Sequence, residues 1–208
     1  MMYQAILIRS GYVEKGLSDR RLALSWNTAI KSLSSQTLKP CVHIEMDRLD
    51  PNASARIEAF ESTGCDVRVF WIGDNHGWGI PSGRKLLHRL DDDDMISVDF
   101  CGRSLEAAIK EAGDVAVIWP NGFVLFKDRL HPLTHNKNQF VALATDRNGW
   151  HPYLDNHHNY FVMSEWRNCI VTQDRGWCWV RHSDAWTKTR KVYLSESDVP
   201  LSALMERF

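Results

Sequence analysis

The first hundred residues alternate short apolar runs with stretches in which apolar residues recur at helical spacing. Runs of four to eight apolar or alternating residues are typical of strands, and spacing of three to four residues is typical of amphipathic helices. The runs predict strands over residues 3–8, 41–46, 66–72 and 85–90. The helical spacing covers residues 18–33 and 52–60. This order predicts an α/β fold with a mostly parallel sheet and helices on both faces.

The second half is less regular. Residues 104–112 and 138–145 are predicted to be helices, and residues 178–181 a late strand, followed by a last helix over 201–208. Strands over residues 115–120 and 123–126 flank Asn121-Gly122, a dipeptide that favours a tight hairpin. No repeat or low-complexity linker interrupts the 208 residues, so the sequence indicates a single domain.

Four adjacent aspartates, Asp91 to Asp94, follow the fourth predicted strand. Neighbouring carboxylates repel one another unless a cation offsets their charge, and Mg²⁺ and Mn²⁺ prefer oxygen ligands. A solvated acidic loop is the alternative. Open α/β sheets bind ligands beyond the carboxyl ends of their strands. We therefore expect Arg9-Ser10, Asp47, Gly73-Asp74 and the aspartates to meet at one edge of the sheet.

Composition narrows the classes of function. The formal net charge of −1 gives no basic field for nucleic acid, and no apolar window reaches the length of a membrane-spanning helix. The sequence starts without the apolar core of a signal peptide. Five cysteines without a CxxC spacing fit reduced thiols rather than a disulfide framework. We therefore expect a cytoplasmic protein with no nucleic-acid partner and no membrane span.

A strand is predicted to end in Arg-Leu-Asp-Asp-Asp-Asp at residues 89–94, and a first helix near Gln36-Thr37. Three more segments stand out: Ile8-Arg9, a Pro-Asn-Gly-aromatic segment at residues 120–123, and a Trp-x-x-Val-x-His segment at residues 177–182. In this order the segments resemble a family of rhamnosyltransferases within the GT-A-type nucleotide-sugar glycosyltransferases, with His157 at the position of an earlier histidine of that family. These matches span almost the whole chain, from about residue 8 to residue 184.

The sequence departs from the family at two places. Ala144-Thr145-Asp146 stands where the family has a glutamate, and Ser183 follows His182 where the family has glycine. The first departure leaves the identity of the catalytic base open. Carboxylates commonly supply that base. Asp155 and Asp146 are the two candidates, and the sequence does not choose between them.

The resemblance implies a GT-A-like fold, a nucleotide-diphosphate sugar donor and a glycan or lipid-linked acceptor. It also implies a Mn²⁺ or Mg²⁺ cofactor that acts as a Lewis acid on the departing diphosphate. Residues 1–100 would form the nucleotide-sugar-binding half and residues 101–208 the acceptor side. The metal ligands implied are Asp93, Asp91 and His182, and the donor contacts are Arg9, Arg89, Asp91, Asp92 and Asp94.

Simpler interpretations exist for several of these residues. His182 could be a histidine with a structural hydrogen bond, and Arg89 could form an ordinary ion pair with the aspartates. At the level of the whole protein, a non-catalytic nucleotide- or sugar-binding domain on the same fold is the alternative function. A metal-dependent phosphotransferase or nuclease would require further carboxylates that meet the aspartate run, and none stands out in the sequence.

Overall fold

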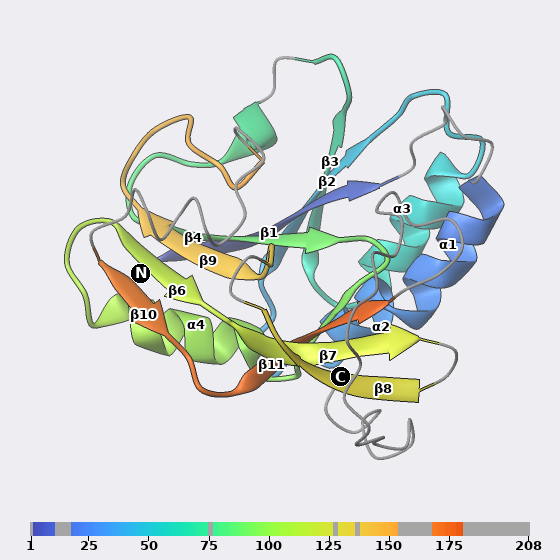
Figure 1. The fold of residues 1–208 in the computed structure, drawn as a ribbon. Helices are drawn as coiled ribbons and strands as arrows, with labels where there is room; N and C mark the ends of the chain where they lie inside the picture. The colour runs from blue at the N-terminus through green and yellow to red at the C-terminus, as the bar shows by residue number, and fades with distance from the viewer. Residues whose placement is uncertain are drawn as a thin grey trace.

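The structure, a computed structural model, describes residues 2–10, 18–74, 77–126, 129–135, 138–153 and 168–180; within these, the side chains of residues 18–21, 126 and 129 are not included. The predicted helix over 201–208 and residue 181 of the late strand lie outside the described residues. Figure 1 shows a large central sheet with helices packed against it. The fold is mixed α/β, as the sequence predicts.

In the described part of the chain, the main sheet has seven strands in the order β10-β6-β9-β4-β1-β2-β3. Neighbouring pairs among β1, β2, β3 and β4 are parallel, as are β6 and β10. Among the described strands of this sheet, β9 alone is antiparallel to its neighbours, β4 and β6. The prediction of a mostly parallel sheet is therefore confirmed. The strands are β1 (Tyr3–Ser10), β2 (Cys41–Met46), β3 (Asp66–Trp71), β4 (Lys85–Asp91), β6 (Val115–Ile118), β9 (Val141–Thr145) and β10 (Cys169–Val171).

Four α-helices are described: α1 (Ser18–Asn27), α2 (Ala29–Ser34), α3 (Ala53–Glu61) and α4 (Phe100–Ile109). The single helix predicted over 18–33 is interrupted at Thr28, whose φ of −126° and ψ of −96° are not helical. The Thr28 hydroxyl donates to the carbonyls of Leu24 at 2.8 Å and Asp92 at 3.2 Å. The interruption thus joins the helical segment to the aspartate run. None of the helices in the described ranges is long and apolar enough to cross a bilayer.

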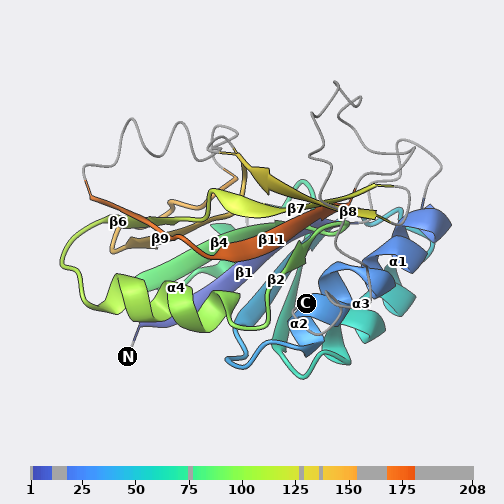
Figure 2. The same cartoon turned by 60° about the horizontal axis from the view of Figure 1, so that its bottom comes forward.

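The helices α2, α3 and α4 pack on one face of the main sheet, as Figure 2 shows. Their apolar residues join those of β1, β2, β4, β6 and β9 in one large buried cluster. In the described part of the chain, the opposite face of β1 and β4 is covered by Trp78, from the short 3-10 helix η2 (Gly77–Gly79), and by Tyr153. The expectation of helices on both faces is therefore not met where the structure describes the chain. The second face is instead an aromatic layer.

A second sheet has four strands in the order β5-β11-β7-β8. The predicted hairpin at Asn121-Gly122 is wrong, because both residues lie inside β7 and the flanking strands belong to different sheets. A Cβ on Gly122 would lie 2.1 Å from the Trp177 ring, so glycine is required here for close packing rather than for a turn. The strands are β5 (Met95–Ile96), β7 (Asn121–Phe126), β8 (Arg129–Thr134) and β11 (Arg175–Val180).

The helix predicted over residues 138–145 is also wrong. The segment contains β9, whose five residues are all buried between β4 and β6. A strand buried on both faces is continuously apolar, and its sequence does not show the alternation that marks a half-buried strand. The short run Val-Ala-Leu-Ala therefore gave no signal that separates a strand from a helix.

Candidate active site

The carboxyl ends of β1, β2 and β4 meet at one edge of the main sheet. Arg9 pairs in register with Asp91 on β4 and with Glu45 on β2. The sequence analysis placed the aspartates at the end of a central strand beside Arg9, and the strand order and register confirm this placement. This edge is where ligands bind in open α/β sheets.

The four aspartates form a turn between β4 and β5, in which the Asp94 amide donates to the Asp91 carbonyl at 3.1 Å. The turn separates their side chains. Asp91, Asp93 and Asp94 each offer a carboxylate oxygen, and these oxygens lie within 4.8 Å of one another. We call these three residues the carboxylate cluster. Asp92 is fully buried and takes another direction.

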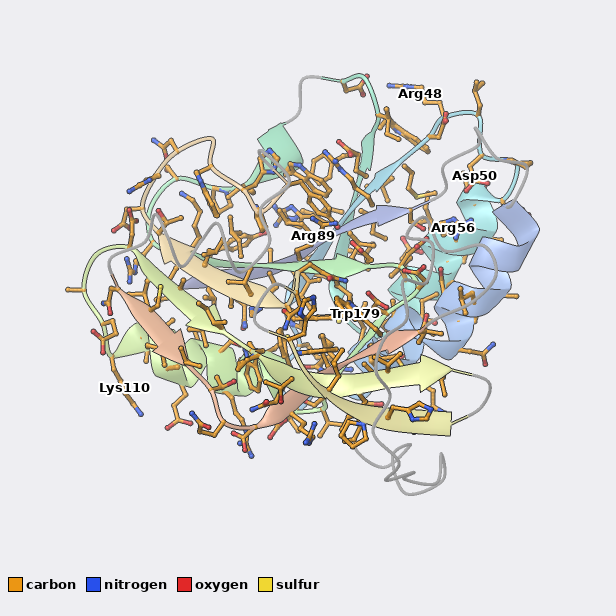
Figure 3. All side chains as sticks on the ribbon, viewed as in Figure 1. Arg48, Asp50, Arg56, Arg89, Lys110 and Trp179 are labelled. Atoms are coloured by element: carbon orange, nitrogen blue, oxygen red, sulfur yellow. The ribbon has the colours of Figure 1, made fainter. Side chains whose placement is uncertain are left out.

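Asp92 belongs to a buried polar network that supports the turn. Its carboxylate accepts a hydrogen bond from the Ser10 hydroxyl at 2.6 Å and lies 3.9 Å from a guanidinium nitrogen of Arg56. Arg56 is fully buried and donates to Asp50 at 3.0 Å. Figure 3 shows Arg56 and Asp50 together beside α3. The network fixes Asp92 inside the protein, so we do not propose it as a donor contact.

Asp94 connects the carboxylate cluster to the second sheet. One of its oxygens accepts from the backbone amide of Val180, at the end of β11, at 3.0 Å. The other accepts from the Gln139 side chain at 2.8 Å. Both partners come from segments far along the chain, so the position of Asp94 depends on the tertiary fold.

Two arginines and an aromatic ring lie beside Asp91. The Arg89 Nε lies 3.2 Å from an Asp91 carboxylate oxygen. The guanidinium carbons of Arg9 and Arg89 lie 4.5 Å and 4.7 Å from the centre of the Tyr153 ring, within the range of cation–π attraction. Burial opposes the charge of Arg89, but the Asp91 carboxylate and Tyr153 outweigh it, so the pKa of Arg89 is raised. Arg9 also forms an ion pair with Glu45 at 2.7 Å.

Tyr153 is anchored across the two central strands. Its hydroxyl lies 3.2 Å from the carbonyl of Leu7 on β1 and 3.2 Å from the carbonyl of Leu90 on β4. Its ring stacks on Trp78, with centroids 5.3 Å apart and planes inclined by 7°. The ring that contacts both arginines is therefore held by both strands and by a second aromatic residue.

Trp78 adopts a positive φ of 59°, which is rare for a bulky residue and costs of order 1–3 kcal/mol. The Trp78 carbonyl accepts a hydrogen bond from Nδ1 of the buried His43. The other ring nitrogen of His43, Nε2, accepts from the Tyr3 hydroxyl at 2.6 Å. This assignment of donor and acceptor corresponds to neutral His43, which burial favours by lowering its pKa from 6.5 to about 4. The strained residue is thus held by a buried histidine beneath the aromatic layer.

Asp146, a predicted site residue, is not brought to this edge. Asp146 follows β9, which pairs antiparallel with β4 so that Thr145 lies opposite Lys85. Asp146 therefore lies at the opposite edge, about 20 Å from Asp91 at roughly 3.3 Å per strand residue. There it is exposed and lies 3.7 Å from Arg84. The structure thus separates Asp146 from the carboxylate cluster, and its role as a base stays a prediction. Asp155, His157 and His182 lie outside the described residues.

The sequence analysis missed the residues that support the site. Arg56 could have been found, because it lies three and four residues before the buried Ala59 and Phe60 on one face of α3. A charged residue on an apolar helical face indicates a buried partner. Tyr153 and Gln139 had no comparable local signal, because their partners come from β1, β4 and the aspartate turn.

The carboxylate cluster fits a hard divalent cation. Oxygen ligands lie about 2.1 Å from Mg²⁺, so two ligands of one ion are at most about 4.2 Å apart. The oxygens of the cluster lie within 4.8 Å of one another, so modest side-chain rotation would bring them into that range. An all-oxygen donor set suits Mg²⁺ and Mn²⁺ rather than softer metals.

No protein-family model matches the sequence, and no curated protein matches it either. Among solved structures, residues 1–349 of TarS from S. aureus match with a TM-score of 0.51 and 11% identity, over 86% of this chain and 60% of that chain. This chain therefore spans less than two thirds of the TarS structure. The likeness shows a shared mixed α/β fold, with a large central sheet flanked by helices.

A weaker likeness is to a glucose-1-phosphate thymidylyltransferase from Bacillus anthracis, with a TM-score of 0.47 and 10% identity over 85% of this chain and 88% of that chain. HddC from Yersinia pseudotuberculosis follows, with a TM-score of 0.45 and 8% identity over 86% of this chain and 90% of that chain.

Proposed function

We propose that this protein is a glycosyltransferase that moves a sugar from a nucleoside-diphosphate-sugar donor and depends on a divalent cation. The observation that carries the proposal is the carboxylate cluster at the carboxyl end of β4, the central strand beside Arg9, in a GT-A-like fold. The family resemblance favours rhamnose as the sugar and a glycan or lipid-linked acceptor.

Asp91 and Asp93 would hold Mn²⁺ or Mg²⁺, with Asp94 as a further ligand or as the group that positions them. A cation at this place supplies Lewis acidity to the leaving diphosphate. Arg9 and Arg89 lie beside Asp91, and arginine forks bind phosphate oxygens in pairs. Their proposed role is to bind and orient the diphosphate of the donor. Asp155 as base and His182 as a metal ligand stay predictions on residues that the structure does not describe.

Calorimetry with nucleoside diphosphates, in Mn²⁺ and in EDTA, tests the proposal. Wild-type protein should bind a nucleoside diphosphate at least about tenfold more tightly with Mn²⁺, and it should consume the matching nucleotide-sugar. Asp93→Asn should lose most of both effects, because it removes one ligand charge. Asp66→Asn is the matched control, since Asp66 is an exposed aspartate at the opposite end of the parallel strands.

The results also separate the alternative functions. Cation-dependent binding without turnover of any nucleotide-sugar would favour the non-catalytic binding domain. Equal affinity in Mn²⁺ and EDTA would contradict the proposal.

A further inference from the structure

Asp91 has two competing uses in the proposed site. It belongs to the carboxylate cluster, and the same carboxylate carries the ion pair with Arg89. A guanidinium at 3.2 Å from a metal ligand offsets the negative charge that would attract a cation. The Arg89 side chain is 15% exposed and that of Asp91 33% exposed, so water screens this pair less than it would screen a surface pair.

Arg89 is held where it can serve either partner. Its guanidinium rests on the Tyr153 ring, which is fixed by the carbonyls of Leu7 and Leu90 and stacked on Trp78. This contact holds the guanidinium group over the ring, and rotation of the planar group over the ring changes which oxygen acceptor its N–H groups face. The donor set of Arg89 fits carboxylate and phosphate equally well.

We propose that Arg89 is an internal counter-ion of Asp91 that exchanges partners: it pairs with Asp91 when no cation is bound, and with the diphosphate of the donor when a cation occupies Asp91. Tyr153 is the positioning residue that keeps Arg89 within reach of both. This inference rests on the proposed function. It makes Arg89 oppose binding of the cation alone and favour binding of the nucleotide.

These two effects have opposite signs, and this makes the inference testable. In Arg89→Gln, the affinity for Mn²⁺ alone should rise by at least about threefold, because a competing positive charge is removed. At saturating Mn²⁺, the affinity for a nucleoside diphosphate should fall by roughly tenfold or more, because a charged hydrogen-bond donor is lost. Mn²⁺ binding is measured by electron paramagnetic resonance and nucleotide binding by calorimetry.

Arg68→Gln is the matched control. Arg68 forms the same kind of pair with the aspartate two residues away on its strand, Asp66 at 3.4 Å, and also lies near an aromatic ring, that of Tyr3. The Arg68→Gln substitution removes the same charge as Arg89→Gln but on β3, and Asp66, the partner of Arg68, lies at the edge of the sheet opposite the carboxylate cluster. Both affinities should stay within about twofold of wild type, since charges separated by more than a Debye length are largely screened.

Arg89→Lys provides a second test if the glutamine variant folds poorly. It retains the positive charge beside Asp91, so the Mn²⁺ affinity should stay close to wild type. It loses the fork and the flat contact with Tyr153, so the nucleotide affinity should still fall. A structural role alone would lower the melting temperature without this division between the two ligands.

The outcomes separate the inference from the function on which it rests. Wild-type protein that binds no Mn²⁺ would overturn both. Wild-type protein that binds Mn²⁺, with Arg89→Gln no tighter than Arg68→Gln, would overturn the partner exchange and leave the proposed function standing. If Arg89→Gln lost affinity for both Mn²⁺ and the nucleotide, the partner exchange would also be overturned. Arg89 would then be a residue that supports the structure of the aspartate turn.

Discussion

The Ser10 hydroxyl donates a hydrogen bond to the buried Asp92 carboxylate at 2.6 Å, which ties the end of β1 to the turn that carries the carboxylate cluster. One aspartate of the four thus fixes the turn, while a carboxylate oxygen of each of the other three lies within 4.8 Å of the others. The position of the proposed metal site depends on this contact between the end of β1 and the turn that follows β4.

Ser10→Ala should therefore destabilise the protein by about 1–3 kcal/mol, because a buried carboxylate loses a hydrogen-bond donor. Urea unfolding measures the change. Ser35→Ala is the control, since its hydroxyl makes an exposed bond to the Lys31 carbonyl, and its effect should stay within about 0.5 kcal/mol. Equal effects of the two variants would show that the Ser10–Asp92 bond does not support the turn.

Divalent cation should raise the melting temperature of the wild-type protein, because the ligand binds only the folded state. Asp93→Asn should remove most of this rise. In EDTA the same variant should melt at the wild-type temperature or slightly higher, since it relieves carboxylate repulsion. Scanning calorimetry measures the melting temperatures of the wild-type protein and of Asp93→Asn in Mn²⁺ and in EDTA. A variant that melts lower in EDTA, with an unchanged response to Mn²⁺, would assign Asp93 a structural role only.

Acid should weaken the fold through two buried histidines. Burial lowers the pKa of His43 to about 4 and that of His88 to about 3, from an ordinary value of 6.5. Between the ordinary pKa of 6.5 and the lowered pKa of each buried histidine, the unfolded chain binds a proton that the folded chain does not. The free energy of unfolding therefore falls as the pH decreases from about 6.5 to 4. Each histidine adds a slope of up to about 1.4 kcal/mol per pH unit.

His88→Phe should reduce that slope, measured as the free energy of unfolding in urea across the same pH range. The His88 Nδ1 has no hydrogen-bond partner among the described residues, and its Nε2 lies 2.9 Å from the Gln4 side-chain amide. Among the described residues, removing the imidazole therefore breaks one side-chain hydrogen bond, the one with Gln4. An unchanged slope would show that His88 does not titrate on unfolding in this range.

Gly122→Ala should be severely destabilising, by about 3 kcal/mol or more, because the new Cβ would lie 2.1 Å from the Trp177 ring. Gly102→Ala is the control. It lies inside α4 with its nearest contacts at 3.9 Å, so alanine should stabilise the helix by about 0.5–1 kcal/mol. Thermal unfolding compares the two. A small loss in Gly122→Ala would mean that the two β strands can separate at little cost.

The sequence by itself determined the parallel half of the fold and the place of the aspartates. Strands β1 to β4 have local apolar patterns, and the run of acidic residues directly after β4 marks its carboxyl end. Because parallel strands direct their carboxyl ends to one edge, the common edge of Arg9 and Asp91 followed from local pattern, whereas the pairing of β1 with β4 that places them side by side was decided by the tertiary fold. The helix over 52–60 was found for the same reason, to within a residue at each end.

Only the tertiary structure decided which aspartates converge and what surrounds them. Four identical residues carry no local signal that sends Asp92 to Ser10 and Arg56 and the other three to one cluster. Segments with contradictory local signals were also decided by packing, since Asn121-Gly122 became a strand against Trp177 and the run before Asp146 became β9. Asp146 was consequently carried to the far edge of the sheet. Contacts between residues distant in sequence outweigh local preference wherever burial is complete, because each such contact exists only in the assembled fold.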